Sequence, residues 1–400
     1  MKPIKKNHIK QKKPNYSCQN WEFGELGKLF SFTGGLGISR EQLGNRGIPY
    51  LHYGDMHKDN FSYVSYDNYV ALPKYDIKIN GDESFLLKDG DVVFLDASED
   101  LTGTSRCVVV DNPDNKPFIA GLHTFIARPL NNSLSKWYKK YFTQTQMVQK
   151  QFEHLAVGIK VYTVNRNDIK KIIVSFPKSI KEQQKIAKIL TKWDDAIELQ
   201  KQLIENLELQ KKSLIQHVFQ KNTDKFMFWG DICTIAKGTQ INNDQLLENG
   251  KYYMLNGGIV PSGFLNKWNT PADTISISEG GESCGFVQFN KQKFWSGGHL
   301  YTLQKIKDGI YNKYLYAYLK HNEKKIMALR VGSGLPNIQL ASLNKFRINI
   351  VNYKKQEYIG NLFFDMEEQI SLHSQKLDLL TCQRKALMQR LLTGAIRVKV

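Results

Sequence analysis

The stretch LELQKKSLIQHVF, residues 207–219, recurs as LTCQRKALMQRLL, residues 380–392. The two segments are identical at five of thirteen positions, and most of the others keep their chemical type. The copies lie 173 residues apart, which leaves room for a complete domain between them. This repeated, helix-like segment decides how the chain is organised.

Apolar residues recur at alternating steps of three and four around both copies, the 3.5-residue period of a coiled-coil seam. The first seam reads Ile186, Leu190, Trp193, Ile197, Gln200, Ile204, Leu207, Lys211, Leu214 and Val218. The second reads Ile359, Phe363, Met366, Ile370, His373, Leu377, Leu380, Arg384, Leu387 and Leu391. Both copies place their polar exceptions at the same positions. The pattern predicts two long helices, 181–221 and 355–394.

A long helix with one apolar stripe needs a partner in water, and its own copy offers a matching stripe. We therefore predict antiparallel pairing about a pseudo-two-fold axis, with Arg384 beside Trp193 and Lys211 beside Met366. A guanidinium over an indole is a favourable contact. The residues predicted to pair the helices are Leu190, Trp193, Ile197, Ile204, Leu207, Leu214, Phe363, Met366, Ile370, Leu377, Leu380, Arg384 and Leu387. The alternative is that each helix packs into a separate core.

Helix start signals precede both copies. Ser179 and Glu182 have capping-box spacing after Pro177, whereas the second copy offers only Asn352 as a cap. The segments before the helices also correspond, since FIAGLHTF (118–125) and FWSGGHLY (294–301) share an F-x-x-G-x-H frame. The chain is therefore predicted as a basic, flexible tail (1–20), a first domain (21–180), the central helix, a second domain (222–354) and the C-terminal helix. β-Branched runs such as TISIS (274–278) predict mixed α/β domains.

The formal net charge is +18, and its placement points to a polyanionic partner. Residues 1–20 hold six lysines and no acidic residue. Between Arg128 and Lys178 there are ten basic residues, interleaved with aromatics, against only Glu153 and Asp168. Such a surface suits a nucleic-acid backbone. The alternative is a basic protein whose charge serves only solubility.

The five cysteines lie far apart without a C-x-x-C pair, which argues against a zinc cage or a disulfide framework and for a reducing compartment. No apolar run approaches the length of a membrane span. The predicted location is the cytoplasm, without a membrane partner.

Together these features resemble the specificity subunits of type I restriction-modification systems. The resemblance covers essentially the whole chain after residue 20. It is carried by WEFGELGKLFSFTGG, IPYLHYGDM, DGDVVFLDA, the KEQQKIAKILTKWDDAIELQKQLIENLELQKKSLIQHVF segment and its echo ending LMQRLLTG. The helix entry EQQKIA, followed by D-x-x-I and QKKSLIQ, is specific to this family. The second helix departs from it, with KQEYIG in place of EQQKIA and no preceding proline.

The resemblance implies an α+β fold of two pseudo-symmetric mixed α/β target-recognition domains, separated and joined by two long antiparallel coiled-coil helices. Each domain would read one half of a bipartite site on double-stranded DNA. The helices would set the spacer and dock two modification subunits that methylate adenine with S-adenosylmethionine. Restriction subunits, which translocate and cut DNA with ATP and Mg²⁺, would join them. The chain itself would bind no cofactor and catalyse nothing.

Residue chemistry agrees with a non-catalytic chain. The N-P-P-Y or D-P-P-Y tetrapeptide of adenine methyltransferases is missing, and FTGGLG (32–37) lacks the spacing of a nucleotide loop. NPDNKPF (112–118) is better explained as a turn than as a nuclease site. HYGDMH (52–57) is better explained as a loop than as a metal site. SEGGESCG (278–285) has no base beside its serine or cysteine. We predict no catalytic residue and no metal ligand.

Loops on a rigid scaffold are where base-reading side chains are displayed. In the first domain the predicted DNA-binding residues are Thr33, Gly34, Ser39, Arg40, Arg46, Ser105, Arg106, Lys160 and Tyr162. In the second they are Lys237, Thr239, Gln240, Asn242, Ser283, Arg330, Ser333 and Asn337. The alternative for any one of them is a loop residue that contacts only phosphate or nothing. For the whole chain, the alternatives are a coiled-coil adaptor without DNA readout and a fused restriction-methylation enzyme.

Overall fold

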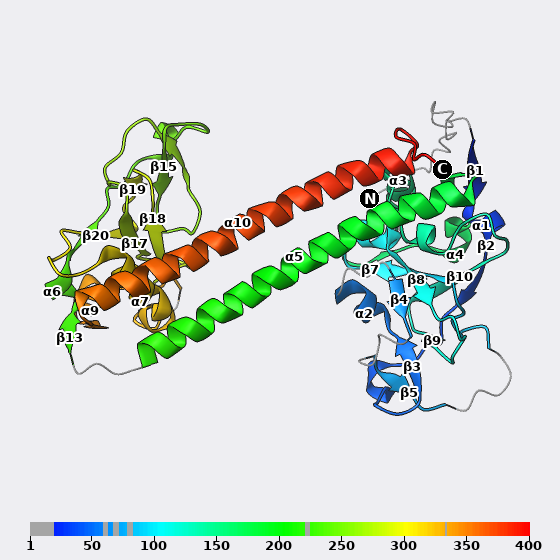
Figure 1. Ribbon diagram of the computed structural model, residues 1–400, viewed down its shortest axis with the longest axis horizontal. Coiled ribbons are helices and arrows are strands. Elements are labelled where there is room, and N and C mark those ends of the chain that lie inside the picture. Colours follow the sequence, from blue (N-terminus) through cyan, green and yellow to red (C-terminus); the bar gives the residue numbers. More distant parts are fainter. Residues whose placement is uncertain (1–19, 59–62, 67–71, 78–82, 221–224, 333) are drawn as a thin grey trace. The chain divides into compact units, whose positions relative to one another are not determined.

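The computed structural model describes residues 20–58, 63–66, 72–77, 83–220, 225–332 and 334–400 (Figure 1). Residues 1–19 of the predicted tail, and the predicted contact residue Ser333, lie outside this part of the chain. The chain divides into two compact units, one made of residues 1–198 with 378–400 and the other of residues 199–377. Within the described residues, no helix has the length and apolar character needed to span a bilayer.

The two predicted long helices are confirmed as α5 (Ile180–Gln220) and α10 (Tyr353–Leu392). α10 begins 173 residues after α5 begins, so the structural repeat has the spacing of the sequence repeat. The predicted caps are also present. The Ser179 hydroxyl accepts the Glu182 amide at 3.4 Å, and the Asn352 side-chain oxygen accepts the Lys355 amide at 2.9 Å.

Unit 1 is built around a five-stranded sheet in the order β2-β10-β6-β8-β4, antiparallel except for the parallel pair β4 and β8. Its strands are β2 (Phe30–Gly34), β4 (Tyr63–Ser65), β6 (Val92–Leu95), β8 (Cys107–Asp111) and β10 (Thr124–Pro129). The smaller sheets pair β1 (Trp21–Glu25) with β12 (Ile173–Pro177), β7 (Ala97–Ser98) with β11 (Tyr162–Thr163), and β3 (Ile48–Leu51) with β5 (Lys74–Tyr75) and β9 (Ile119–Ala120). Its short helices are α1 (Leu26–Leu29), η1 (Arg40–Gln42), α2 (Tyr53–Lys58), η2 (Thr102–Ser105), η3 (Trp137–Lys140), α3 (Gln146–Leu155) and α4 (Arg166–Ile169).

Unit 2 has a four-stranded antiparallel sheet in the order β14-β20-β17-β18. Its strands are β14 (Thr234–Lys237), β17 (Thr274–Ser278), β18 (Val287–Asn290) and β20 (Leu300–Gln304). The smaller sheets pair β13 (Phe226–Phe228) with β21 (Arg347–Asn349), and β15 (Tyr252–Leu255) with β16 (Gly263–Leu265) and β19 (Trp295–Ser296). Its short helices are α6 (Trp229–Ile232), η4 (Asn243–Gln245), α7 (Asn312–His321), α8 (Glu323–Met327) and α9 (Leu340–Asn344).

The two units repeat one topology. Each begins with a strand that pairs antiparallel with the last strand before its long helix, β1 with β12 and β13 with β21. Each continues through a one-turn helix into an edge strand, β2 or β14, that pairs with β10 or β20. Each also contains a parallel strand pair, β3 with β9 and β15 with β19. The predicted class of two pseudo-symmetric mixed α/β domains with two long helices is confirmed.

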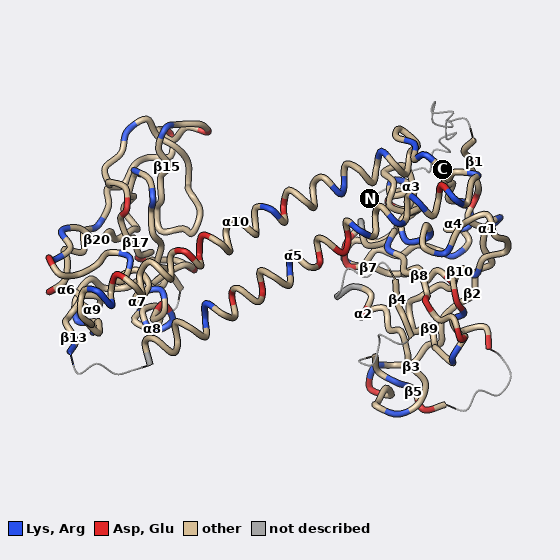
Figure 2. The backbone as a smooth tube through the Cα atoms, in the orientation of Figure 1, with Lys and Arg blue, Asp and Glu red and all other residues tan. Residues whose placement is uncertain are grey.

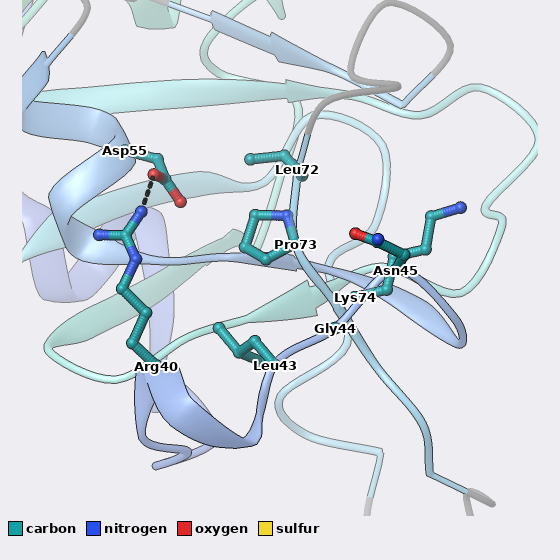
Figure 3. Close-up of a pocket in the computed structure, with 8 residues that line it drawn as sticks. All are labelled: Arg40, Leu43, Gly44, Asn45, Asp55, Leu72, Pro73 and Lys74. Atoms are coloured by element: carbon teal, nitrogen blue, oxygen red, sulfur yellow. Dashed lines mark hydrogen bonds and ion pairs between the residues drawn. The ribbon is translucent and has the colours of Figure 1, made fainter.

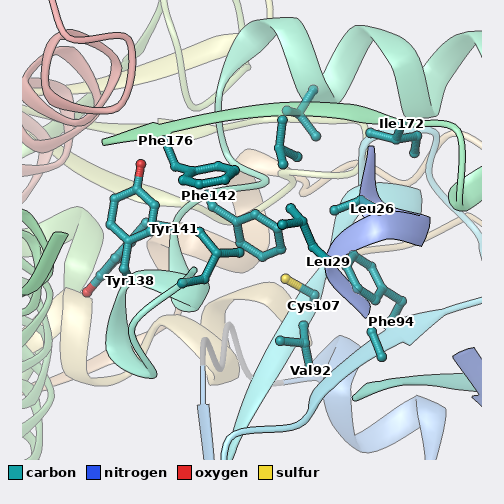
Figure 4. Packing of buried hydrophobic residues seen from close by; sticks show 14 of the residues in the cluster. Leu26, Leu29, Val92, Phe94, Cys107, Tyr138, Tyr141, Phe142, Ile172 and Phe176 are labelled. Carbon is teal, nitrogen blue, oxygen red and sulfur yellow. The ribbon is translucent and has the colours of Figure 1, made fainter. Parts of the chain in front are cut away.

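The long helices belong to the core of each unit. In unit 1, Ile186 and Leu190 of α5 and Leu391 of α10 are buried in the same cluster as Phe94 and Phe142 of the domain (Figure 4). In unit 2, Ile215 of α5 and Phe363 of α10 join the core that surrounds Trp229. Burying a large apolar side chain contributes roughly 1.5–3 kcal/mol, so each domain is fastened firmly to the helices.

A buried glutamine at each helix entry fixes the domain to the helix. The Gln183 side-chain oxygen accepts the Ser135 amide at 2.7 Å, and its Nε2 donates to the Pro177 carbonyl at 2.8 Å. In unit 2, Gln356 accepts the Tyr311 amide at 2.9 Å and donates to the Val351 carbonyl at 2.8 Å. The two glutamines are 173 residues apart, so the repeat preserves this contact although the surrounding sequence differs.

The heptad seam is visible in the solvent exposure of α5. Between Ile197 and Leu214 the only residues that are not exposed are Ile197, Gln200, Ile204, Leu207, Lys211 and Leu214, all of them predicted seam positions. In unit 2 the polar exceptions Gln200 and His373 contact each other, with Gln200 Nε2 2.8 Å from His373 Nδ1. Side chains from the two helices therefore meet along the predicted stripe.

Two ion-pair clusters of the same design connect the helices. In unit 1, Arg384 Nε donates to Asp194 Oδ1 at 3.0 Å, and the Tyr141 hydroxyl donates to Asp194 Oδ2 at 2.6 Å. In unit 2, Lys211 Nζ donates to Glu367 Oε1 at 3.3 Å, and the Tyr316 hydroxyl donates to Glu367 Oε2 at 3.1 Å. Each residue on one helix has its counterpart 173 positions away on the other.

The ionic partners of the two seam cations are the residues next to those predicted to face them. Arg384 bonds to Asp194, the residue after the predicted partner Trp193, and its guanidinium lies 5.9 Å from the centre of the Tyr141 ring. Lys211 likewise bonds to Glu367, the residue after Met366. The reason is physical, because a charge-assisted hydrogen bond to a carboxylate is stronger than a cation–π contact at a partly exposed site.

Asp194 also faces the buried Lys140 ammonium at 3.7 Å, so its removal is predicted to destabilise unit 1. Burial lowers the pKa of Lys140, and Asp194 opposes that change. We expect Asp194→Ala to lower the free energy of unfolding by about 2–3 kcal/mol, because a buried cation loses its main partner. The control Glu205→Ala, an exposed acidic residue on α5 that is not among the charges acting on Lys140, should change it by less than about 0.5 kcal/mol. Urea unfolding of the full chain measures both, and equal effects would contradict the assigned role.

Candidate nucleic-acid interface

In both central sheets a glycine lies where the edge strand ends and the next loop begins. This glycine packs against the backbone of the segment that contains the F-x-x-G-x-H frame. In unit 1, the Gly35 amide donates to the Thr124 carbonyl at 3.1 Å, and the Leu36 amide donates to the Ala120 carbonyl at 2.8 Å. A Cβ on Gly35 would lie only 2.1 Å from the Gly121 carbonyl oxygen. The glycine is required here, because any side chain would separate the loop from the sheet.

Unit 2 repeats this anchor with different neighbours. The Gly238 amide donates to the Leu300 carbonyl and the Thr239 amide to the Ser296 carbonyl, both at 2.9 Å. A Cβ on Gly238 would lie 2.2 Å from the Gly297 carbonyl oxygen. The acceptors in both units lie within the matching segments FIAGLHTF (118–125) and FWSGGHLY (294–301), so these segments hold the first loop after the edge strand.

The histidine of each frame meets an acidic residue at the end of the neighbouring strand. His123 Nδ1 lies 3.0 Å from Asp96 Oδ1, and His299 Nδ1 lies 3.7 Å from Glu279 Oε2. The two acids follow β6 and β17, and their backbone amides donate to the histidine carbonyls at 3.1 and 3.0 Å. Both imidazoles are exposed, whereas both carboxylates are more protected.

Glu279 organises further polar groups of unit 2. Lys237 Nζ donates to Glu279 Oε1 at 2.6 Å, and the Tyr301 hydroxyl donates to the same oxygen at 3.0 Å. Burial and the adjacent carboxylate raise the pKa of Tyr301 to about 12, so the phenol keeps its proton and remains a donor. The lysine head is thus held at the surface beside His299.

In unit 1 the loop after the glycine anchor forms a basic hollow of about 550 Å³. Figure 3 shows its lining, which consists of Arg40, Leu43, Gly44, Asn45, Asp55, Leu72, Pro73 and Lys74. Arg40 and Asp55 form an ion pair across it at 3.2 Å, while more than half of the Arg40 side chain stays exposed. Such a half-exposed pair contributes little to stability, so the guanidinium is available to a stronger anion.

In each unit a third loop, residues 157–163 or 331–337, is closed by backbone hydrogen bonds beside the acidic residue. Val157 and Thr163 exchange two backbone hydrogen bonds of 2.9 Å, and Val331 and Asn337 exchange two of 2.8 and 3.0 Å. The next residue in each case donates its amide to the backbone carbonyl of the acidic residue, Val164 to that of Asp96 at 3.0 Å and Ile338 to that of Glu279 at 2.9 Å. The loop after the edge strand, the loop after the acidic residue and this third loop therefore lie close together in each unit.

Most predicted contact residues are displayed on the surface. The exposed ones are Ser39, Arg40, Arg46, Lys160, Lys237, Thr239, Gln240, Asn242, Arg330 and Asn337. The partly exposed ones are Thr33, Gly34, Arg106, Tyr162 and Ser283. Ser105 does not fit the expectation of a displayed residue, because its side chain is 91% buried in η2. Whether any of them contacts DNA stays a prediction.

Some of these residues lie near one another, whereas others form hydrogen bonds or ion pairs within their own unit. Lys237 and Asn337 both reach the Glu279 segment, Asn337 through a backbone bridge to Gly280. Thr33 and Ser283 instead donate their hydroxyls to the Ser84 and Gly257 carbonyls at 3.1 and 2.6 Å. Arg106 pairs with Asp100 at 3.7 Å.

Sequence reasoning missed the acids Asp96 and Glu279, and it left His123 and His299 out of the contact residues. The histidines carried a signal, since they occupy the shared frame. The acids carried none, because each is brought to its histidine only by the pairing of non-adjacent strands.

The other motifs serve local structure. In NPDNKPF the Asn112 side-chain oxygen accepts the Lys116 amide at 3.0 Å, which is the predicted turn. In HYGDMH, His52 Nδ1 accepts the Gly54 amide at 3.0 Å, and burial lowers the His52 pKa. Cys284 is buried and directs its thiol to the Glu279 carbonyl. Across the described residues, no group of three or more His, Cys, Asp or Glu is arranged to hold a metal ion.

Known proteins share this architecture. The family model for the type I restriction modification DNA specificity domain matches residues 19–209 and 223–381. A Mycoplasma genitalium protein named as a type I specificity subunit is 24% identical over 258 residues, which span 61% of this chain and 67% of the relative. A Methanocaldococcus jannaschii protein named as a type I restriction enzyme specificity subunit is 23% identical over 356 residues, 81% and 82% of the two chains.

Among solved structures, the S subunit of a type I restriction-modification system from M. genitalium superposes with a TM-score of 0.68 at 21% identity. The match covers 95% of this chain and 97% of that one. At this identity the likeness demonstrates a common fold.

The glycine anchor can be tested by adding a single methyl group. We predict that Gly35→Ala displaces the first loop, because the new Cβ would overlap the Gly121 carbonyl. Gly44→Ala is the matched control, since a Cβ there meets nothing within 4 Å. Hydrogen exchange at the Gly35 and Leu36 amides should accelerate by at least about tenfold in the first variant only, which corresponds to about 1.4 kcal/mol of lost local stability. Protected amides in Gly35→Ala would contradict the anchor.

Proposed function

The chain belongs to the family of type I restriction-modification specificity subunits, and from this premise we propose that each of its units reads one half of a bipartite site on double-stranded DNA. The two long helices set the number of unread base pairs between the half-sites and dock two modification subunits. The chain contributes recognition, and the chemistry is performed by its partners.

The observation that carries this proposal is a constant scaffold with different displayed side chains. The glycine anchors Gly35 and Gly238 and the two acid–histidine pairs recur, whereas the loops beyond them carry Arg40 and Arg46 in unit 1 but Gln240 and Asn242 in unit 2. Arg, Gln and Asn are the residues that form bidentate contacts with base edges. Two different sets on one scaffold fit two different half-sites.

The helices support a partner that is present twice. Outside the seam, Gln210 and Lys212 on α5 are identical to Gln383 and Lys385 on α10, and all four side chains are exposed. Figure 2 shows both basic and acidic residues distributed along the two helices. A polar face that is repeated without serving the core suits docking of two copies of one modification subunit.

The cofactors belong to the partners in this proposal. The modification subunits methylate adenine with S-adenosylmethionine, and the restriction subunits translocate and cut DNA with ATP and Mg²⁺. The complex acts in the cytoplasm, where its DNA is located. A coiled-coil adaptor without DNA readout is the rival function, and it differs in what the loops must do.

A charge-removal experiment separates the two functions. We predict that replacing Arg40, Arg46, Lys237 and Arg330 together by Ala weakens DNA binding of the purified complex at least about a hundredfold and lowers the slope of log affinity against log salt by roughly 2–4. The matched control removes four exposed cations elsewhere in the two units, Lys28, Lys171, Lys307 and Lys345. Equal affinities for the two variants would favour the adaptor.

The target itself can be mapped in cells. We predict that N6-methyladenine mapping, with and without this chain beside its cognate modification subunit, reveals a motif of two short half-sites and a fixed gap. Replacing residues 21–180 by the corresponding domain of a relative should change one half-site and leave the other and the gap unchanged. A change in both half-sites would contradict independent reading by the two units.

A further inference from the structure

The third loop of each unit exposes apolar side chains that the fold does not use. Val157, Ile159 and Val161 in unit 1 are 66%, 92% and 49% exposed. In the corresponding loop of unit 2, Val331 and Leu335 are 52% and 87% exposed. None of these five residues belongs to a hydrophobic core cluster. A single exposed apolar residue is ordinary, but the same feature at equivalent places in two divergent domains indicates a shared task.

The backbone forces the loop tip outward. The closing valine is followed in each unit by a glycine with positive φ, +149° at Gly158 and +96° at Gly332. A Cβ on Gly158 would lie 1.9 Å from the Val161 carbonyl oxygen, so this tight return is restricted to glycine. The paired hydrogen bonds between Val157 and Thr163 then fix the base of the loop. Ile159 therefore lies in a short loop whose base is fixed by these hydrogen bonds.

The loop sequences carry basic and no acidic residues at or next to the apolar positions. Residues 157–163 and 331–337 contain no acidic residue, whereas Lys160 and Arg330 are adjacent to the apolar side chains and exposed. Each loop emerges beside the acid–histidine pair, through the amides of Val164 and Ile338. An apolar tip flanked by cations is complementary to a surface with anions outside and apolar planes inside. A DNA groove has that character where a base step opens, with phosphates along its edges and apolar base faces between the unstacked pairs.

We infer that Ile159 and Leu335 are DNA wedges, each of which enters a groove of the half-site read by its unit and packs against one base step. This inference rests on the proposed function and adds to it a mechanism of shape-dependent readout. Partial unstacking at the wedged step bends the duplex, and pyrimidine–purine steps deform most easily. Each unit therefore gains sequence preference at a step where no polar side chain contacts a base edge.

The test uses the complex with its modification subunits and a duplex carrying the mapped motif, with 2-aminopurine placed in turn at each step of both half-sites. The unchanged complex should raise the fluorescence at one step of each half-site besides the methylated adenine, which the modification subunit itself takes out of the stack. Ile159→Ala should abolish the rise in one half-site only and weaken binding by about tenfold, and Leu335→Ala should do the same in the other. Ile159→Leu should retain both properties. All substituted positions are exposed, so unchanged melting temperatures verify folding.

Leu130→Ala is the matched control, because Leu130 is 59% exposed in the same unit but follows the opposite end of β10 from His123. It should alter neither fluorescence nor affinity. The wedge is overturned if the unchanged complex binds the bipartite duplex and Ile159→Ala binds it equally well with the same fluorescence. It is also overturned if Ile159→Ala instead weakens binding of the modification subunit in the absence of DNA. Failure of the unchanged complex to bind any bipartite duplex would overturn the proposed function itself.

Discussion

The rest of the structure depends on one constraint, which is that an α-helix of about 40 residues with a single apolar stripe cannot stay exposed in water. The chain contains two such helices, and side chains of their apolar stripes contact each other. The ends of the helices enter the cores of the two units, so Ile186 and Leu391 are buried together in unit 1 and Ile215 and Phe363 in unit 2. The core of each unit therefore contains side chains of both long helices as well as of the domain.

An apolar stripe alone would tolerate slippage by a heptad, and polar contacts at fixed positions prevent it. Arg384 with Asp194 and Lys211 with Glu367 are each completed by a tyrosine hydroxyl from the neighbouring domain. A shift of the helices would leave these partly buried charges unpaired, which is far more costly than the pairs are worth in themselves. The glutamine clamps at Gln183 and Gln356 act in the same way at the helix entries.

Sequence periodicity was sufficient to predict the helices, their caps and the pseudo-symmetry, because these depend on local pattern and on an internal repeat. It was not sufficient for the polar contacts that accompany the seam. Asp194 accepts from both Arg384 and the Tyr141 hydroxyl, and Tyr141 lies 53 positions before Asp194 in the sequence. The strand order β2-β10-β6-β8-β4 was equally inaccessible, since its neighbours are distant in sequence and its strands are short.

The same non-local pairing explains the errors at the candidate interface. Asp96 meets His123 because β6 pairs with β10, and no spacing rule connects the two residues. Ser105 was chosen for its polar type beside Arg106, but the short helix η2 turns its hydroxyl into the fold. Residue type indicated which side chains were able to read DNA, while only the sheet topology determined which of them are displayed.

This arrangement separates folding from recognition. The contacts that hold the loops are made by backbone groups at Gly35 and Gly238 and by the acids at the strand ends, so the side chains beyond them are free to differ. The cations at the surface are held by weak, half-exposed pairs such as Arg40 with Asp55 and Lys237 with Glu279. A pair of this kind contributes about 0–1 kcal/mol, which is enough to orient a side chain and too little to prevent exchange of the carboxylate for a phosphate or a base. Under the proposed function, preorganised but exchangeable cations, on loops whose supports do not depend on them, would let two domains with one fold serve two different half-sites.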